Sequence, residues 1–145
     1  MKAVRSAGDA LDLNRLPAPL WSERDGGRRL LAVALARDPD SGRILVGLTD
    51  HQILARDRTG ISMMAPGLRA LHARAKAAGR ALPIALVIGG PPALYLAAAL
   101  AHARPDADLA LAGGLLGAPL RWRRLTASRC RARRRRAGDR RHDPG

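Results

Sequence analysis

The chain has 145 residues, 47% apolar and only 2% aromatic, which is enough for one domain with an aliphatic, alanine-rich core. The formal net charge is +14, but residues 121–145 carry eleven Arg against two Asp, a balance of +9 that leaves +5 for the first 120 residues. The single cysteine, Cys130, excludes an internal disulfide and a zinc site built on several cysteines.

The start of the chain does not resemble a signal peptide, because residues 1–10 contain charged side chains and no apolar stretch. No apolar run reaches the roughly 18 residues that a membrane-spanning helix needs. We therefore expect no membrane span and a cytoplasmic location. Residues 1–8 show no periodicity and are expected to be disordered.

The first half of the chain predicts strands joined by turns. Two prolines, Pro17 and Pro19, favour an extended backbone before the first turn, at residues 25–27 (Asp-Gly-Gly). Apolar runs between clusters of turn-forming residues predict strands at residues 30–36, 44–54 and 61–64. The first two strands form a predicted antiparallel hairpin whose turn is the Asp-Pro-Asp-Ser-Gly cluster at residues 38–42, and a second turn is expected at residues 56–60.

The second half predicts helices on either side of a buried strand. Pro66 starts an amphipathic helix that Gly79 ends. The residues on its apolar face are Leu68, Leu71 and Ala75. A strand at residues 82–88, a Gly-Gly turn and a second helix over residues 92–103 follow. Strands gathered into hairpins and followed by helices favour an α+β fold.

The end of the chain, residues 122–145, contains a block of four arginines and no hydrophobic periodicity. We predict that this basic tail is disordered and binds polyanions non-specifically by counterion release. It offers no aromatic side chain beyond Trp122 for stacking on bases. Its thiol, Cys130, is expected to be oxidisable rather than catalytic, because no positioned base accompanies it.

Two other candidate sites have simpler structural explanations. The four histidines are scattered along the chain, so His51 and His72 are expected to be surface or internally satisfied polar groups rather than metal ligands. Gly89-Gly90 precedes a helix and could in principle hold a phosphate through backbone N–H groups. A tight turn is the preferred interpretation, since Pro91 and Pro92 remove two of those donors.

Two segments of the second half carry a pattern of a known enzyme family. Residues 82–99 follow Leu-Pro-x-Ala-x-x-Ile-Gly-Gly-x-Pro-Ala-Leu-x-Leu-Ala-Ala-Ala, and residues 112–120 follow Ala-Gly-x-Leu-x-Gly-x-Pro-Leu. An Asp-Leu-x-x-Leu-Pro-x-Pro motif at residues 12–19 precedes them in the same order. This ordered set resembles the UbiD family of non-oxidative (de)carboxylases, which use prenylated FMN. The resemblance extends over about residues 8–121.

The resemblance implies that residues 9–121 are part of the family's central domain, a partial split β-barrel related to flavin-binding barrels, with two or three helices. It implies prenylated FMN and a divalent metal, Mn²⁺ or Mg²⁺, as cofactors, and a small aromatic or unsaturated carboxylic acid as substrate. The positions that match the family's cofactor contacts are Leu48, Thr49, Ala98, Ala99 and Leu100, and the one that matches a metal ligand is Asp108.

Other positions depart from the family's pattern. The family's strand motif Asn-x-Gly-x-Tyr-Arg aligns with residues 45–50, but Leu45 stands at the metal-binding Asn and Asp50 at the catalytic Arg. Leucine has no oxygen to offer a hard cation, and Asp50 inverts the charge where a carboxylate substrate must be held. No residue is assigned a catalytic role, and we expect the chain to be inactive alone.

Three interpretations stay open. The chain is a truncated or degenerate UbiD-like carboxy-lyase, or a non-catalytic subunit that docks through an open barrel edge onto a full-length UbiD-like subunit or a copy of itself, or a small basic nucleic-acid-binding protein. A further hypothesis is that residues 122–145 arise from a frameshift, because the family continues differently after this point. The DNA sequence tests that hypothesis.

Overall fold

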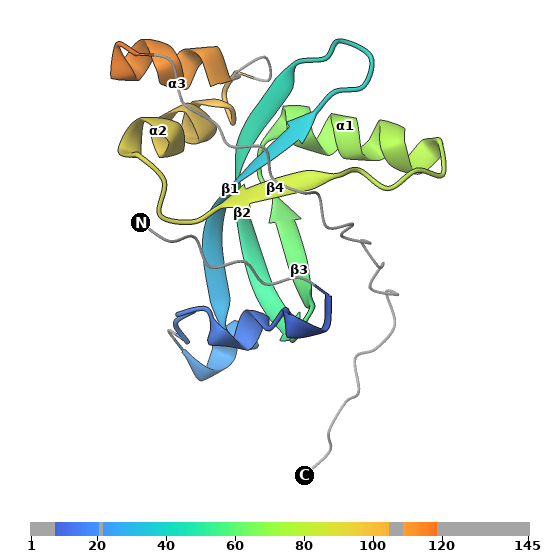
Figure 1. Cartoon of the computed structure of the whole chain (residues 1–145), viewed down its shortest axis with the longest axis vertical. Coiled ribbons are helices and arrows are strands. Elements are labelled where there is room, and N and C mark those ends of the chain that lie inside the picture. The colour runs from blue at the N-terminus through green and yellow to red at the C-terminus, as the bar shows by residue number, and fades with distance from the viewer. Residues whose placement is uncertain (1–7, 21, 105–108, 119–145) are drawn as a thin grey trace.

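Four strands form one open antiparallel sheet with the order β3-β2-β1-β4 (Figure 1). The computed structural model describes residues 8–20, 22–104 and 109–118. The strands are β1 Arg29–Arg37, β2 Ile44–Ala55, β3 Arg58–Met63 and β4 Ile84–Val87. The helices are α1 Pro66–Ala77, α2 Pro92–Leu100 and α3 Leu109–Leu116, preceded by the short 3-10 helices η1 Gly8–Ala10, η2 Leu13–Arg15 and η3 Glu23–Asp25. The predicted α+β class is confirmed, and the sheet of the described residues does not close into a barrel.

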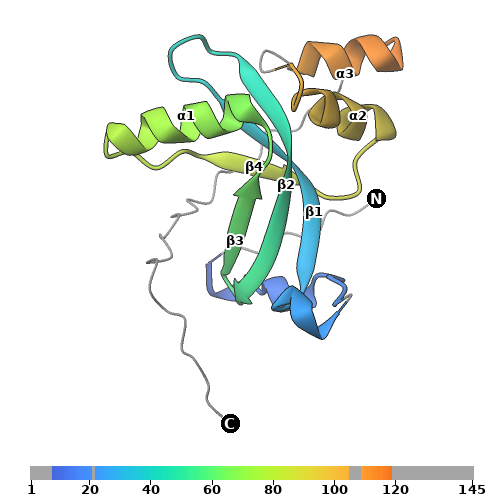
Figure 2. The ribbon, with the colours of Figure 1, turned by 180° about the vertical axis from the view of Figure 1, so that it is seen from behind.

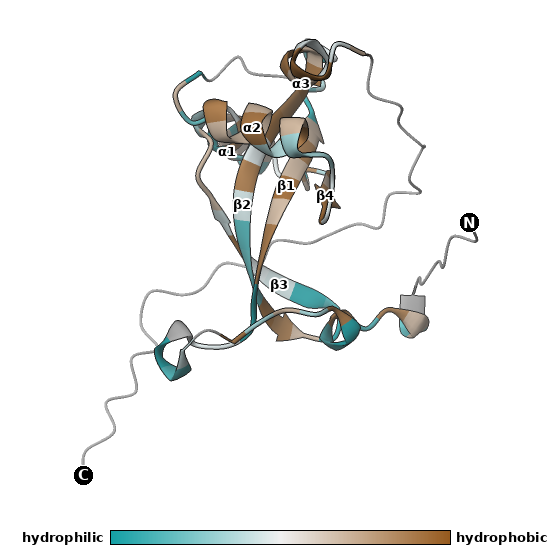
Figure 3. Cartoon of the chain, turned by 90° about the vertical axis from the view of Figure 1, so that its left-hand side faces the viewer, coloured by the Kyte–Doolittle hydropathy of each residue, from teal (hydrophilic) through white to brown (hydrophobic). Residues whose placement is uncertain are grey.

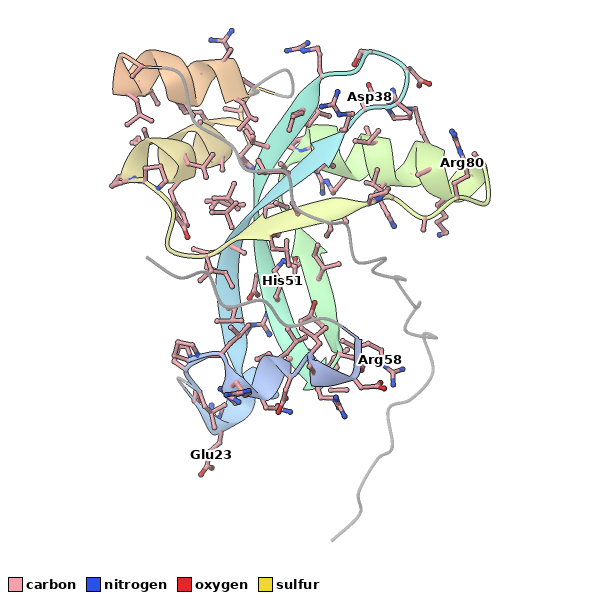
Figure 4. The ribbon with its side chains drawn as sticks, viewed as in Figure 1. Glu23, Asp38, His51, Arg58 and Arg80 are labelled. Atoms are coloured by element: carbon pink, nitrogen blue, oxygen red, sulfur yellow. The ribbon has the colours of Figure 1, made fainter. Side chains whose placement is uncertain are left out.

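The turn between β1 and β2 is organised by Asp38, which lies at one end of the sheet (Figure 4). The Asp38 carboxylate accepts hydrogen bonds from the Asp40 backbone N–H and from the Ser41 hydroxyl, each at 3.1 Å. Gly42 closes the turn at a φ of +71°, which a residue with a side chain adopts only with strain. Every residue of β1 then has a partner in β2. The predicted hairpin and its turn are therefore confirmed.

The turn between β2 and β3 is tighter than the sequence predicted. It consists of Arg56 and Asp57 alone, so the expected turn over residues 56–60 was wrong in its second half. Thr59 lies inside β3 because its hydroxyl reaches His51 of β2, at 3.1 Å, and this contact extends the pairing of the two strands toward the turn. Tertiary pairing here overrides the turn preference of the local sequence.

The edge strand β4 is shorter than the predicted strand at residues 82–88. Only Ile84–Val87 pairs with β1, because Pro83 has no N–H to give to a strand ladder. After the strand, Gly89 takes a φ of +72° and donates its N–H to the Tyr95 hydroxyl at 3.0 Å. The glycine pair thus forms the tight turn that leads into α2.

Helix α1 packs on one face of the sheet. Its leucines Leu68 and Leu71 are each 2% exposed, as the periodicity predicted. Helix α1 approaches the sheet most closely at Gly47, which has no side chain. A Cβ added there would stand 2.5 Å from the Ala65 Cβ and 2.8 Å from the Leu68 Cδ1. Basic side chains of α1, among them Arg69 and Lys76, stay exposed on its outer side.

Helices α2 and α3 cover the opposite face. A Cβ added at Gly90, just before α2, would stand 2.9 Å from the Val87 Cγ1, on the face away from α1. Helix α2 buries Leu94, Ala97 and Ala98 against the sheet, and α3 packs on α2. Figures 2 and 3 show that the three helices gather around one end of the sheet, whereas the β2–β3 turn and the 3-10 helices lie at the other end.

The side chains of Arg28 and Arg56 hold the N-terminal segment, residues 8–20, against this second end of the sheet. We call the three contacts of Arg28 the Arg28 clasp. Arg28 Nε donates to the Ala18 carbonyl at 3.0 Å, Nη1 donates to the Asn14 carbonyl at 3.0 Å, and Nη2 donates to the Leu16 carbonyl. Arg56, in the β2–β3 turn, donates to two carbonyls in and beside η1. The extended conformation expected before the first turn is thus stabilised mainly by bonds to its backbone.

Among the described residues, no helix combines the length and the apolar character needed to cross a bilayer. The cytoplasmic location stays a prediction. So do the domain boundary at residue 121 and the disorder of the two ends, because residues 1–7 and 119–145 lie outside the described residues.

Candidate functional site

The two strand residues predicted to contact a flavin, Leu48 and Thr49, point to opposite faces of β2, because side chains alternate along a strand. Leu48 lies in a row with Val33 and Val87 on the α2 face and is half-buried. Thr49 is fully buried on the α1 face, where it lines a hollow with Leu68. A molecule bound on one face of the sheet would therefore meet only one of the two side chains.

A buried chain of hydrogen bonds links β1, β2 and β3 around His51, which lies mid-sheet in Figure 4. The Thr49 hydroxyl donates to the Ala32 carbonyl at 3.2 Å, and its oxygen lies 2.9 Å from His51 Nε2. On the other side of the ring, Nδ1 lies 3.1 Å from the Thr59 hydroxyl. Since the one hydroxyl proton of Thr49 goes to Ala32, Nε2 must carry the ring proton, and Nδ1 accepts from Thr59.

The imidazole of His51 is therefore held neutral and fully bonded. Burial lowers the pKa of His51 below its usual value, because the charged ring would lose its water shell, and the neighbouring Asp50 carboxylate opposes this effect only in part. With both ring nitrogens engaged, His51 binds a metal only if one of these bonds breaks, and it takes a proton at Nδ1 only if the Thr59 hydroxyl turns from donor to acceptor. This matches the prediction of an internally satisfied polar group.

Asp50 is paired with Arg29 on the sheet face opposite His51. Arg29 Nε lies 3.0 Å from Asp50 Oδ2 and 3.3 Å from Oδ1, and Nη2 also contacts Oδ2. The two side chains are 36% and 28% exposed. The carboxylate that stands where the resemblance led us to expect an arginine thus faces a guanidinium from the neighbouring strand, and the two charges compensate each other.

The three helix positions predicted to face the flavin diverge at the end of α2. Ala98 is 1% exposed and belongs to the same apolar core as Leu48 of β2. Ala99 and Leu100 are exposed, because each residue advances the helix by about 100°. The structure therefore brings Ala98 and Leu48 into one layer and leaves the other two positions outside it.

Neither the predicted metal ligand nor a cluster of metal-binding side chains is found among the described residues. No group of three or more His, Cys, Asp or Glu side chains within them could hold a metal ion, and Asp108, the predicted ligand, lies outside these residues. Leu45, at the position of the expected Asn ligand, packs against the core and offers no oxygen. The hollow between α1 and the sheet, lined by Thr49 and apolar side chains, admits no water molecule.

Thr59 was predicted only as a turn residue, and no sequence pattern had singled out Arg28, whose side chain holds the N-terminal segment. One usable signal existed for the buried chain, because Thr49 and His51 are two residues apart in a predicted strand and must share a face. Two polar groups on a buried face need partners from neighbouring strands. Arg28 bonds to backbone carbonyls, which every residue has, so no residue type in the sequence marks these contacts in advance.

A comparison with models of known protein families identifies the family to which this chain belongs. A family model named UbiD, described as the 3-octaprenyl-4-hydroxybenzoate carboxy-lyase Rift-related domain, matches residues 1–132. The chain belongs to the UbiD family. The resemblance inferred from the sequence is therefore confirmed.

Relatives of this UbiD chain are considerably longer. A Rhodospirillum rubrum protein from the cooM 5' region is 35% identical over 116 residues, which are 76% of this chain and 25% of the relative. The pyrrole-2-carboxylic acid decarboxylase of Pseudomonas aeruginosa is 28% identical over 122 residues, 78% of this chain and 23% of the relative. The chain thus spans about a quarter of the length of these curated relatives.

A solved structure shows the same fold. The UbiD-class enzyme HmfF from Pelotomaculum thermopropionicum, in complex with FMN, matches with a TM-score of 0.69 and 34% identity, over 82% of this chain and 28% of that one. An evolved dimeric form of HmfF was solved in complex with prFMN. The UbiD fold of these enzymes therefore agrees with the open α+β arrangement described above.

Proposed function

We propose that this UbiD chain is part of the central domain of a prenylated-FMN-dependent carboxy-lyase and does not decarboxylate a substrate by itself. The proposed substrate is a small aromatic or unsaturated carboxylic acid. Two similar proteins support this class by name, the pyrrole-2-carboxylic acid decarboxylase of Pseudomonas aeruginosa and the 3,4-dihydroxybenzoic acid decarboxylase of Klebsiella pneumoniae. Prenylated FMN, when bound, supplies an electron sink for the carbanion that loss of carbon dioxide leaves.

The observation that carries the proposal is that the polar groups of β2 are already used within the fold. A metal needs oxygen donors and a carboxylate substrate needs a cation. Leu45 lies against the core, the Thr49 hydroxyl is bonded to the Ala32 carbonyl and His51, and the Asp50 carboxylate is bonded to Arg29. We therefore propose that the missing donors come from residues outside β2, with Asp108 as the proposed metal ligand.

The test is cofactor loading in a strain that produces prenylated FMN. The purified chain, with Mn²⁺ added, is scanned for flavin absorbance and assayed for carbon dioxide release from pyrrole-2-carboxylate and from 3,4-dihydroxybenzoate. We expect no stoichiometric flavin and no release above buffer. The Pseudomonas aeruginosa decarboxylase, produced in the same strain, is the positive control. Stoichiometric flavin together with turnover by the chain alone would contradict the proposal.

A second candidate function is a non-catalytic subunit that docks onto a full-length UbiD-like chain. The observation in its favour is the sheet edge, since β4 pairs with β1 alone among the described strands. Leu86 within β4 and Ile88 just after it are 39% and 51% exposed. Edge strands are common docking sites. The test is co-purification with a full-length UbiD protein from the same genome, and loss of that complex in Leu86→Lys. Separate elution of the two wild-type chains rejects this candidate.

The origin of residues 122–145 is a separate question. We propose a frameshift, although the family model matches as far as residue 132, beyond the expected limit of the resemblance at Arg121. The DNA sequence of this region decides the matter. An alternative frame that continues the family pattern supports the proposal, and its absence rejects it.

A further inference from the structure

Strand β3 is only weakly attached to the core of the described sheet. It pairs with β2 alone, and none of its residues is buried, whereas Ala32–Ala36 of β1 are all buried. On the α1 face, Ile61 and Met63 of β3 line the hollow that Leu68 also borders, so the strand lacks some of the contacts that a filled core provides. Segments that bury little apolar surface open at a low free energy. We therefore expect β3 to be able to leave the sheet while the central strands stay paired.

The side chain that ties β3 to β2 is His51. Its Nδ1 lies 3.1 Å from the Thr59 hydroxyl of β3, and its Nε2 lies 2.9 Å from the Thr49 hydroxyl of its own strand (Figure 4). Ile61 is the residue opposite His51 in the ladder. The ring is 2% exposed, and its hydrogen-bond partners are neutral hydroxyls rather than carboxylates. A second proton on this ring therefore creates a buried charge with no carboxylate bonded to it.

The charged groups on the elements around His51 do not supply a counter-charge at the ring. Asp50 lies on the opposite face and is bonded to Arg29, and it raises the pKa of His51 less than burial lowers it. The lysine and the arginines of α1 are exposed. The other charged groups, on β1, on η2 and on β3 with its turn, are bonded to partners of their own or exposed. They are Arg28, Asp12, Arg15, Asp57 and Arg58.

We propose that protonation of His51 opens β3 away from β2, so that water reaches the charged ring and the edge of β2 is exposed. In the closed sheet the pKa of His51 is lowered, whereas in the open form it returns to about 6.5. The open form therefore takes up the proton first as the pH falls, and the opening equilibrium shifts by up to about tenfold per pH unit below that value. This opening requires neither flavin nor substrate, so it stands or falls independently of the proposed carboxy-lyase role.

The test is hydrogen–deuterium exchange of the full chain at about one pH unit above and about one below the usual pKa of histidine, with each rate divided by the intrinsic rate at that pH. We expect the amides of β3 to lose about tenfold in protection at the lower pH. Those of β4, the other edge strand, should keep theirs, because β1 separates β4 from the strand of His51. The exchange of β3 should also be nearly insensitive to low urea, since opening one edge strand exposes little surface.

His51→Gln should abolish the pH response of β3, whereas the matched control His72→Gln, on α1, should leave it intact. Circular dichroism verifies that each variant is folded, and if His51→Gln does not fold, the comparison of β3 with β4 in the wild type still decides. A loss of protection that β3 and β4 share equally would indicate unfolding of the whole domain and overturn the proposal. So would a pH response that persists in His51→Gln, or unchanged protection of β3 in the wild type.

Discussion

Gly47 of β2 lies so close to Ala65, which precedes the first residue of α1, that a Cβ built on the glycine would stand 2.5 Å from the Ala65 Cβ. Leu68 approaches the same point, at 2.8 Å. The distance between α1 and the sheet therefore depends on the missing side chain of this one residue.

Gly47→Ala should lower the free energy of unfolding by about 1–3 kcal/mol, because the helix has to move away from the sheet to admit a methyl group. Urea unfolding followed by circular dichroism measures this change. The matched control is Gly114→Ala, in exposed α3 with open space around it, which should raise stability by about 0.5–1 kcal/mol. An unchanged Gly47→Ala variant would contradict the packing of α1 described here.

The pH dependence of stability should report the buried His51. Its pKa is lowered in the folded chain, whereas the unfolded chain titrates near the usual value of about 6.5. As the pH falls through that value, only the unfolded state takes up the proton, so the free energy of unfolding falls by up to about 1.4 kcal/mol per pH unit. The slope ends once the pH passes the lowered folded pKa.

His51→Gln removes this titration and keeps a polar side chain on the strand. Both proteins contain the same three other histidines, so the difference between their pH profiles reports His51 alone. We expect a smaller decrease in stability of the variant between pH 7 and lower pH. Parallel profiles would mean that His51 is solvated in the folded state.

Arg28 should hold the N-terminal segment against the sheet. Arg28→Lys keeps the charge but loses the planar fork that reaches three carbonyls, so we expect a loss of about 1–3 kcal/mol and faster proteolytic cleavage before residue 20. Arg58→Ala, which removes an exposed pair with the adjacent Asp57, is the control and should cost less than about 0.5 kcal/mol. Equal protease sensitivity of the wild type and Arg28→Lys would rule out the clasp.

The pair of Arg29 and Asp50 should contribute little to stability. Both side chains are about one-third exposed, so solvent screens them, and a double-mutant cycle with alanine should give a coupling of about 0.2–1 kcal/mol that shrinks in 0.5 M salt. A much larger, salt-independent coupling would show that the pair is shielded from water.

The parts of the fold that local sequence dictates were predicted well. The turn around Asp38 and the helix from Pro66 follow from residue types whose preferences agree with the surrounding structure. The start of β3 was missed because Thr59 and Gly60 favour a turn locally, while the contact between Thr59 and His51 draws them into the strand. A partner eight residues away cannot be read from a turn propensity.

The candidate site was harder to predict, because a family resemblance assigns positions in the sequence but does not say to which face of a strand or helix each side chain points. Leu48 and Thr49 are neighbours in the sequence and lie on opposite faces of the sheet. Ala98 and Ala99 are likewise divided between core and surface. Their roles as cofactor contacts stay predictions, and so does that of Asp108, which lies outside the described residues.

The clasp at Arg28 has an evolutionary consequence. Its guanidinium binds the main-chain oxygens of Asn14, Leu16 and Ala18, and every amino acid supplies such an oxygen. Inherited replacements in that segment can therefore accumulate without releasing it, while a single missense change at codon 28 removes all three attachments. In a population of homologous genes, variability along the segment and constancy at the arginine would be the expected record.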